Sequence, residues 1–182
     1  TVVLDVRSPE SFAAGHLPGA INVGLEGRFA EFAGSVIDPE TPIVLFGETD
    51  QIAEARTRLS RIGYDHVVGS LVAGSIDMAN VVGTERVTAS ELRGRLREDS
   101  TLVVLDVRGP GEVAEGAIEG SMHIPLVELP QRMNEVTTSN DIVVYCAGGY
   151  RSSIAASILR SQRAPDAVVD LVGGYSAWIE AS

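Results

Sequence analysis

The amino-acid sequence repeats itself, and this internal repeat limits the possible folds more than any other feature. TVVLDVRSPESFAAGHLPGAINV, at the start of the chain, returns in the second half as LVVLDVRGPGEVAEGAIEGSMHI. Two shorter matches follow in the same order. The paired segments are residues 1–23 with 102–124, 42–47 with 141–146, and 70–75 with 170–175. Matches in one order and at nearly one offset predict a duplicated domain of about 80 residues.

The join between the two copies lies around Ala79 to Val87, where ANVVGTERV has no strong periodicity. We therefore predict a first domain at residues 1–80, a linker at 81–86 and a second domain at 87–182. The chain opens directly on a strand-like run and closes as abruptly, which suggests a piece of a longer protein.

Short apolar runs alternate with helical patterns in each copy. VVLDV, IVLF and VVG in the first copy, and VVLDV, IVVY and VVDL in the second, are too apolar for half-exposed strands. Such runs indicate strands buried on both faces, and hence parallel sheets covered by helices. Pro9 and Pro110 mark first helical turns, and further helices are predicted at 50–62, 88–96 and 151–162. The predicted fold class is α/β, with two tandem doubly wound domains, each a central parallel sheet flanked by helices.

Composition excludes several classes of function. The formal net charge is −11, from 14 basic and 25 acidic residues, so neither nucleic acid nor an anionic membrane is a predicted partner. The apolar runs are far shorter than the roughly 20 residues that a membrane span needs. A single cysteine leaves no disulfide framework, which predicts a reducing, cytoplasmic location.

The single cysteine lies in YCAGGYRSS, between a predicted strand and a predicted helix. Ligands of doubly wound sheets gather at the carboxyl ends of strands, where Cys146 falls. Ala147, Gly148 and Gly149 let the backbone curl, because glycine tolerates positive φ. A loop that curls into a helix N-terminus points amides inward and forms an anion cradle. These amides, the helix dipole and Arg151 are expected to lower the pKa of the thiol from about 8.5.

The cysteine has two other interpretations. A free cysteine at a strand end is often a small buried hydrophobic residue, but the glycines, Arg151 and the paired serines favour a nucleophile. A metal site is a poor fit, because there is one cysteine and His16, His66 and His123 are scattered, whereas structural zinc takes clustered ligands. No metal and no cofactor is predicted.

Several motifs together resemble the rhodanese superfamily of sulfurtransferases, over nearly the whole chain and as two tandem domains. They are LDVRSPESFAAGHLPGAINV, LDVRGPGEVAEGAIEGSMHIP, VVYCAGGYRSSIAASIL and LVGGYSAW. The resemblance implies that Cys146 takes a sulfane sulfur from a donor, becomes a persulfide and passes the sulfur to a nucleophilic acceptor. It also implies an active-site loop at 146–151 whose amides hold the persulfide and an anionic donor. The implied substrate-binding residues are Ala147, Gly148, Gly149, Tyr150, Arg151 and Ser152.

Asp106 and Arg108 match the D-V-R motif of the family, and we interpret both as support for the loop or the fold. An Asp and an Arg that flank a strand end usually form a structural ion pair. Trp178, in the last motif, is interpreted as core packing.

Related folds include phosphatases and arsenate reductases, so the length of the loop matters. Cys146 and Arg151 enclose four residues, whereas cysteine phosphatases resemble one another in enclosing five. The shorter loop suits a single sulfur atom better than a tetrahedral phosphoryl group. Thiosulfate, glutathione persulfide, polysulfide and a protein-bound persulfide all remain possible donors, with thiols or cyanide as acceptors. The absence of lysine and the net negative charge slightly favour small persulfides as the sulfur donors.

The first copy departs from the pattern at the decisive position. Its equivalent of VVYCAGGYRSS is VLFGETDQIAE, with Gly47 in place of the cysteine and the acidic Glu48 and Asp50 in the loop. Residues 1–80 are therefore predicted to be an inactive copy, used as a scaffold or to shape the choice of donor. An inactive copy before an active one resembles the C-terminal part of bacterial fusions that begin with a metallo-β-lactamase-like domain. Such a domain would be a partner outside these residues, and the chain could then act as a non-catalytic sulfur-carrying or docking module.

Overall fold

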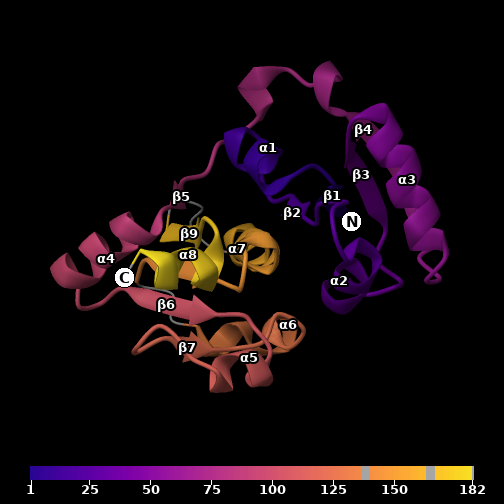
Figure 1. The fold of residues 1–182 in the computed structure, drawn as a ribbon. Coiled ribbons are helices and arrows are strands. Elements are labelled where there is room, and N and C mark those ends of the chain that lie inside the picture. The colour runs from indigo at the N-terminus through magenta and orange to yellow at the C-terminus, as the bar shows by residue number, and fades with distance from the viewer. Residues whose placement is uncertain (137–139, 163–166, 182) are drawn as a thin grey trace. The chain divides into compact units, whose positions relative to one another are not determined.

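The computed structural model describes residues 1–136, 140–162 and 167–181 and divides the chain into two compact units, Thr1–Gly83 and Thr84–Ser182. Each unit contains a parallel β-sheet flanked by helices (Figure 1), which confirms the predicted α/β fold class. In the described part of the chain, no helix has both the length and the apolar character needed to cross a membrane.

The first unit has a four-stranded sheet in the order β2-β1-β3-β4, and each of its strand pairs is parallel. Its inner strands carry buried apolar side chains, such as Leu4, Leu45 and Phe46. The elements are β1 (Val2–Asp5), α1 (Pro9–Ala14), β2 (Ile21–Asn22), α2 (Phe29–Val36), β3 (Ile43–Gly47), α3 (Thr49–Ser60), β4 (Val67–Val72) and the 3₁₀ helices η1 (Ala73–Ser75) and η2 (Met78–Asn80).

The second unit has a five-stranded sheet in the order β5-β9-β8-β6-β7, again with parallel pairs. Strand β8 is buried along its whole length, as expected for a strand covered on both faces. The elements are β5 (Arg86–Val87), α4 (Ala89–Glu98), β6 (Val103–Asp106), α5 (Pro110–Ala114), β7 (Met122–His123), α6 (Leu129–Arg132), the 3₁₀ helix η3 (Met133–Glu135), β8 (Ile142–Tyr145), α7 (Tyr150–Ser161), β9 (Val168–Leu171) and α8 (Gly174–Glu180).

Five of the six apolar runs became inner strands, and as predicted Pro9 and Pro110 are the first residues of α1 and α5. The sixth run, VVG, lies in the edge strand β4, so the prediction that it is buried on both faces was wrong: β4 has one neighbouring strand only, and Val68 is 63% exposed. Sequence reasoning did not find the two-residue strands β2, β5 and β7, which have no apolar run of their own. Strand β5 is held by a side-chain pair as well as by the ladder, because Arg86 Nη2 contacts Asp170 Oδ2 of β9 at 2.8 Å. Arg86, the last residue of the predicted linker, thus belongs to the sheet of the second unit.

The strand order of the second unit determines where a ligand site is expected. From β6 the chain adds β7 on one side and then β8 on the other, so the direction of strand addition reverses between β6 and β8. In such sheets the crevice outside the carboxyl ends of the two strands at the reversal binds ligands. Asp106 ends β6, and Cys146 directly follows β8.

Candidate functional site

Cys146 lies at the predicted position, directly after the central strand β8, and its side chain is only 1% exposed. The N–H of Gly149 donates to Cys146 Sγ at 3.1 Å, and the thiol donates to Ser152 Oγ at 3.5 Å. Gly149 adopts φ +100°, a conformation that favours glycine and that turns its amide back towards the sulfur. The loop therefore wraps around the sulfur atom and supplies it with one donor, the Gly149 amide, and one acceptor, the Ser152 hydroxyl.

The other predicted substrate-binding residues are spread around this turn. Ala147 is half-buried and Gly148 is exposed, so the middle of the loop is open to solvent. Tyr150 is the first residue of α7, and Ser152, the third residue of that helix, is fully buried beside the sulfur. Arg151 extends from the same first turn and is half-buried.

A second segment fixes the loop from the other side. The N–H groups of Tyr175 and Ser176 donate to the carbonyls of Cys146 and Ala147, at 2.7 and 3.1 Å. This approach requires glycine at position 174, which has φ +57°. A Cβ there would lie 2.6 Å from the Ala147 carbonyl oxygen and still closer to that of Cys146. Sequence reasoning noted the adjacent glycines of GGYSAW only as a family motif and did not foresee that they contact the cysteine loop.

Arg151 does not stand alone beside the loop, because Glu112 of α5 binds it with both carboxylate oxygens. Arg151 Nη1 contacts Glu112 Oε2 at 2.6 Å, and Nη2 contacts Oε1 at 2.7 Å. The hydrogen bonds from Arg151 lower the pKa of Glu112 to about 2. In turn, the hydrogen bonds to Glu112, followed by the charge of Cys146, raise the pKa of Arg151. The positive charge that the sequence assigned to the sulfur is therefore shared with a carboxylate.

Sequence reasoning missed Glu112, and the reason is visible in its other contact. Glu112 Oε2 also accepts the N–H of Gly109 at 3.0 Å, as an N-terminal capping residue does. A glutamate in the first turn of a helix therefore looks like a cap in the sequence, and its arginine partner lies far along the chain.

Asp106 and Arg108 form a buried ion pair at the end of β6. Arg108 Nη2 contacts Asp106 Oδ2 at 2.6 Å and donates to the carbonyl of Gly116 at 2.7 Å. The guanidinium carbon also lies 5.4 Å from the ring centre of Tyr145 and 4.3 Å from that of Tyr175. These contacts tie the strand end to the chain beyond α5, and the supporting role of both residues stays a prediction.

Trp178 packs on the apolar core of the second unit, as the sequence suggested, and Arg93 covers its ring at 3.8 Å from the centre. Within the residues that the structure describes, no group of three or more His, Cys, Asp and Glu side chains is arranged to hold a metal ion.

The first unit has no comparable loop. Its strand β3 ends at Gly47, and α3 begins two residues later, at Thr49. A Cβ on Gly47 would lie 2.8 Å from Val6 Cγ2 and 3.2 Å from Gln51 Oε1. The Gln51 amide oxygen is fixed there by accepting the N–H of Glu48 at 3.0 Å. The space that Cys146 takes in the second copy is thus filled in the first.

Comparison with known proteins gives matches to both copies. A family model described as the Rhodanese-like domain matches residues 1–77 and 88–181. The chain is similar to a sulfurtransferase of Allochromatium vinosum, with 34% identity over 92 residues that cover 50% of this chain and 85% of that protein. It is also similar to the thiosulfate sulfurtransferase GlpE of Stutzerimonas stutzeri, with 33% identity over 76 residues, 42% of this chain and 69% of that protein. Among solved structures, a rhodanese-related protein from Thermoplasma volcanium is 32% identical and has a TM-score of 0.49. The match covers 54% of this chain and 93% of that protein.

Proposed function

The chain belongs to the family of rhodanese-like domains, and on that premise we propose that its second copy is a sulfurtransferase that works through a persulfide on Cys146. One observation carries the proposal: the sulfur of Cys146, at the reversal point of a parallel sheet, accepts a hydrogen bond from the amide of Gly149. A backbone amide aimed at the sulfur stabilises a thiolate and the negative charge of a persulfide. The sulfurtransferase relatives are consistent with the same chemistry.

The proposed reaction has two displacements at sulfur. The Cys146 thiolate attacks the outer sulfur of a donor that contains a sulfur–sulfur bond. That bond breaks, and the rest of the donor leaves with the electron pair, as a thiolate from a persulfide or as sulfite from thiosulfate. An acceptor thiolate then attacks the outer sulfur of the Cys146 persulfide and releases the Cys146 thiolate. No external oxidant or reductant is consumed, and the kinetics are expected to be ping-pong.

The pairing of Arg151 with Glu112 supports small persulfides as donors. A lone guanidinium beside the loop would favour a dianion such as thiosulfate, but here a carboxylate occupies two of its donor groups. The loop then offers the Gly149 amide and the Ser152 hydroxyl rather than an uncompensated positive charge. We infer that singly charged persulfides are transferred more efficiently than thiosulfate.

The test is the intact mass of the full chain after brief exposure to glutathione persulfide or to thiosulfate, beside a Cys146→Ser variant. Because Cys146 is the single cysteine, a gain of one sulfur is assigned without further mapping. We expect the gain on the wild type alone, its removal by cyanide or a thiol, and faster loading from glutathione persulfide. A wild-type chain that no donor can load would refute the proposal.

A sulfur-carrying module, as part of a larger persulfide-metabolising protein with a metallo-β-lactamase-like domain, is the second candidate. The near-complete burial of Cys146 favours it, because a buried persulfide is shielded from free thiols. In that case the wild type would load sulfur but would release it to small thiols no faster than an unfolded control peptide does. Phosphatase activity is tested with a chromogenic phosphate ester, and we expect no turnover.

A further inference from the structure

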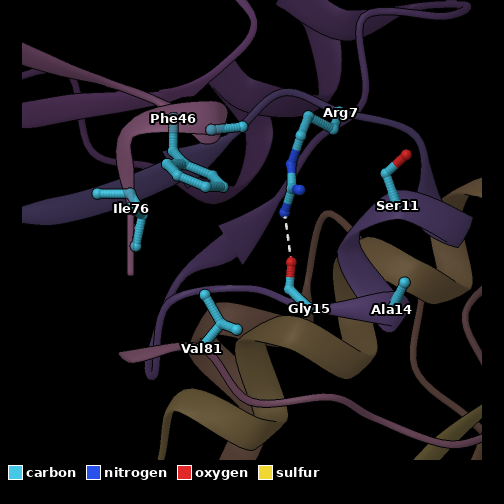
Figure 2. Close-up of a pocket in the computed structure, with 8 residues that line it drawn as sticks. Arg7, Ser11, Ala14, Gly15, Phe46, Ile76 and Val81 are labelled. Atoms are coloured by element: carbon cyan, nitrogen blue, oxygen red, sulfur yellow. Dashed lines mark hydrogen bonds between the residues drawn. The ribbon is translucent and has the colours of Figure 1, made fainter. Parts of the chain in front are cut away.

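The first unit contains a cavity of about 180 Å³ at the carboxyl ends of β1 and β3, the same end of the sheet at which the second unit carries Cys146. Figure 2 shows the Arg7 guanidinium between Phe46 on one side and the α1 residues Ser11 and Ala14 on the other. Ile76 and Val81 lie on the same side as Phe46. The cavity is therefore apolar over most of its wall and has one arginine at its centre.

In the second copy the ring of Tyr175 occupies the equivalent space. There, the ring of Tyr175 lies 4.3 Å from the Arg108 guanidinium and 6.2 Å from the Tyr145 ring, and its hydroxyl lies beside Gly116. The repeat pairs these three contact residues of Tyr175 with Arg7, Phe46 and Gly15 of the first copy. Each of those three residues lines the cavity.

The first copy has no aromatic side chain at the position of Tyr175. The repeat places Ser75 at the position of Tyr175, and its hydroxyl donates to the carbonyl of Val72 at 2.7 Å. The segment forms the short 3₁₀ helix η1 where the second copy has α8, and Ser75 is exposed. Arg7 keeps the contact with the strand aromatic, at 4.5 Å from the Phe46 ring centre, but it has lost the second aromatic contact that Arg108 makes.

We propose that this cavity binds a small, uncharged phenol, whose ring takes the place that the Tyr175 ring has in the second copy. An engineered apolar cavity of about 150 Å³ in another protein binds benzene, so the volume here suits one substituted six-membered ring. An electron-rich ring beside a guanidinium gains from the cation–π interaction.

Charge and hydrogen bonding narrow the class of ligand to neutral phenols. Asp5 binds Arg7 Nε and Nη2, which balances the guanidinium charge and removes the advantage of an anion. Nη2 also donates to the carbonyl of Gly15 at 2.7 Å. Among the described residues no hydrogen bond involves Arg7 Nη1, so this donor is available to a phenol oxygen.

The probe is p-cresol, which is the side chain of tyrosine as a free molecule, titrated into the full chain and followed by ¹⁵N NMR. We expect saturable shifts of the Gly15 and Ala73 amides with a dissociation constant on the order of 1 mM, as for a small fragment. The comparison compound is 4-methylcyclohexanol, which has the same size and a hydroxyl but no aromatic face. It should bind at least about threefold more weakly.

Two variants test the location. Ala14→Phe puts a ring into the cavity from the exposed end of α1 and should weaken p-cresol binding by about tenfold or more. Ala53→Phe, on the exposed face of α3 and outside the cavity lining, is the matched control and should change nothing. Ser75→Tyr places a tyrosine ring at the position equivalent to Tyr175 and should also weaken p-cresol binding. It keeps the test valid if Ala14→Phe does not fold.

The proposal fails if wild-type shifts do not saturate, if Ala14→Phe and Ser75→Tyr both fold and bind p-cresol as the wild type does, or if 4-methylcyclohexanol binds equally well. None of these measurements involves Cys146, so the outcome is independent of sulfur transfer.

Discussion

The two copies share a scaffold but differ around the loop that holds Cys146 in the second copy. Read from its β7 end, the second sheet runs β7-β6-β8-β9, which matches β2-β1-β3-β4 of the first, and β5 is an addition. Asp5 pairs with Arg7 as Asp106 pairs with Arg108, and both arginines donate to the carbonyl of a glycine after the next helix. The scaffold contacts therefore persist in a copy that has no cysteine.

Two of the differences lie in segments that meet at Cys146 in the second copy. The first is the junction after the central strand, which is a wrapped loop in the second copy and a direct entry into α3 in the first. The second is the segment after the last shared strand, which is α8 in the second copy and the 3₁₀ helix η1 in the first. Both segments changed together, as expected if each is needed only to build the sulfur site.

The largest expected effect tests the shared part of this comparison. Asp5→Asn leaves the half-buried Arg7, and Asp106→Asn leaves the buried Arg108, without its buried carboxylate partner. Each change should destabilise its own unit by about 3–5 kcal/mol. Hydrogen exchange measured by mass spectrometry on peptides from each unit reads the two effects separately. The comparison breaks if Asp106→Asn abolishes sulfur loading and leaves the exchange of the second unit unchanged. Asp106 would then act in the chemistry, and its likeness to Asp5 would be incidental.

A somewhat smaller effect is expected at the glycine that lets α8 approach the loop. Gly174→Ala combines a left-handed backbone with a clash against the carbonyls of Cys146 and Ala147, so the second unit should lose about 3 kcal/mol. The matched variant is Gly74→Ala, at the equivalent position of the first copy. A Cβ there meets nothing within 4 Å, so the change should stay within about 0.5 kcal/mol.

Urea unfolding followed by Trp178 fluorescence measures the second unit, because Trp178 is the single tryptophan of the chain. Hydrogen exchange on peptides of the first unit measures the stability of that unit. Equal costs for Gly174→Ala and Gly74→Ala would contradict a close approach that is specific to the copy with Cys146.

These positions also show what the sequence could predict. The repeat, the apolar runs and the paired prolines gave the class of fold, because local patterns and burial on both faces of a strand are visible in a single chain. The residues of the cysteine loop were found for the same reason, since they are contiguous in sequence. The roles that the family resemblance implies for them remain proposals.

Contacts between distant residues could not be predicted in this way. Glu112 reaches Arg151 across the site, and Tyr175 and Ser176 donate to the cysteine loop from the end of the chain. The two-residue strands were missed because their pairing depends on neighbours such as Asp170 and not on their own composition. The cavity in the first copy depends on the absence of one ring, which becomes visible only when the two copies are compared in space.

A smaller effect is expected when the first copy is given a cysteine. Gly47→Cys places a side chain against Val6 and Gln51, which should cost about 1–2 kcal/mol, and it supplies neither the loop nor the second segment. In a Cys146→Ser background we therefore expect no gain of sulfur by intact mass after exposure to glutathione persulfide. A mass gain comparable to that of the wild type would show that a cysteine at this strand end suffices, and that the wrapped loop is dispensable.

The smallest effect concerns the charge pair found only in the second copy. The pKa of Glu112 is lowered from 4.5 to about 2 in the folded chain, so its ionised form stabilises the fold above about pH 4.5. That stabilisation is lost as the pH falls from 4.5 towards 2. Because the Glu112 side chain is 39% exposed, solvent screening reduces the effect to about 1 kcal/mol.

We therefore expect that Glu112→Gln lowers the free energy of unfolding of the second unit at pH 6. Between pH 5 and about pH 3 this free energy should decrease less in the variant than in the wild type. Urea unfolding followed by Trp178 fluorescence measures both effects. The repeat places Ser11 at the position of Glu112, and Gln51 and Ile52 at that of Arg151. Ser11→Glu thus introduces a carboxylate near Arg7 but with no counterpart of Arg151, and it should add a smaller acid-dependent slope to the first unit by hydrogen exchange than Glu112 adds to the second. An equal slope from Ser11→Glu would mean that the capping position and the arginine at the strand end suffice to lower the carboxylate pKa, and the pair with Arg151 would no longer distinguish the two copies.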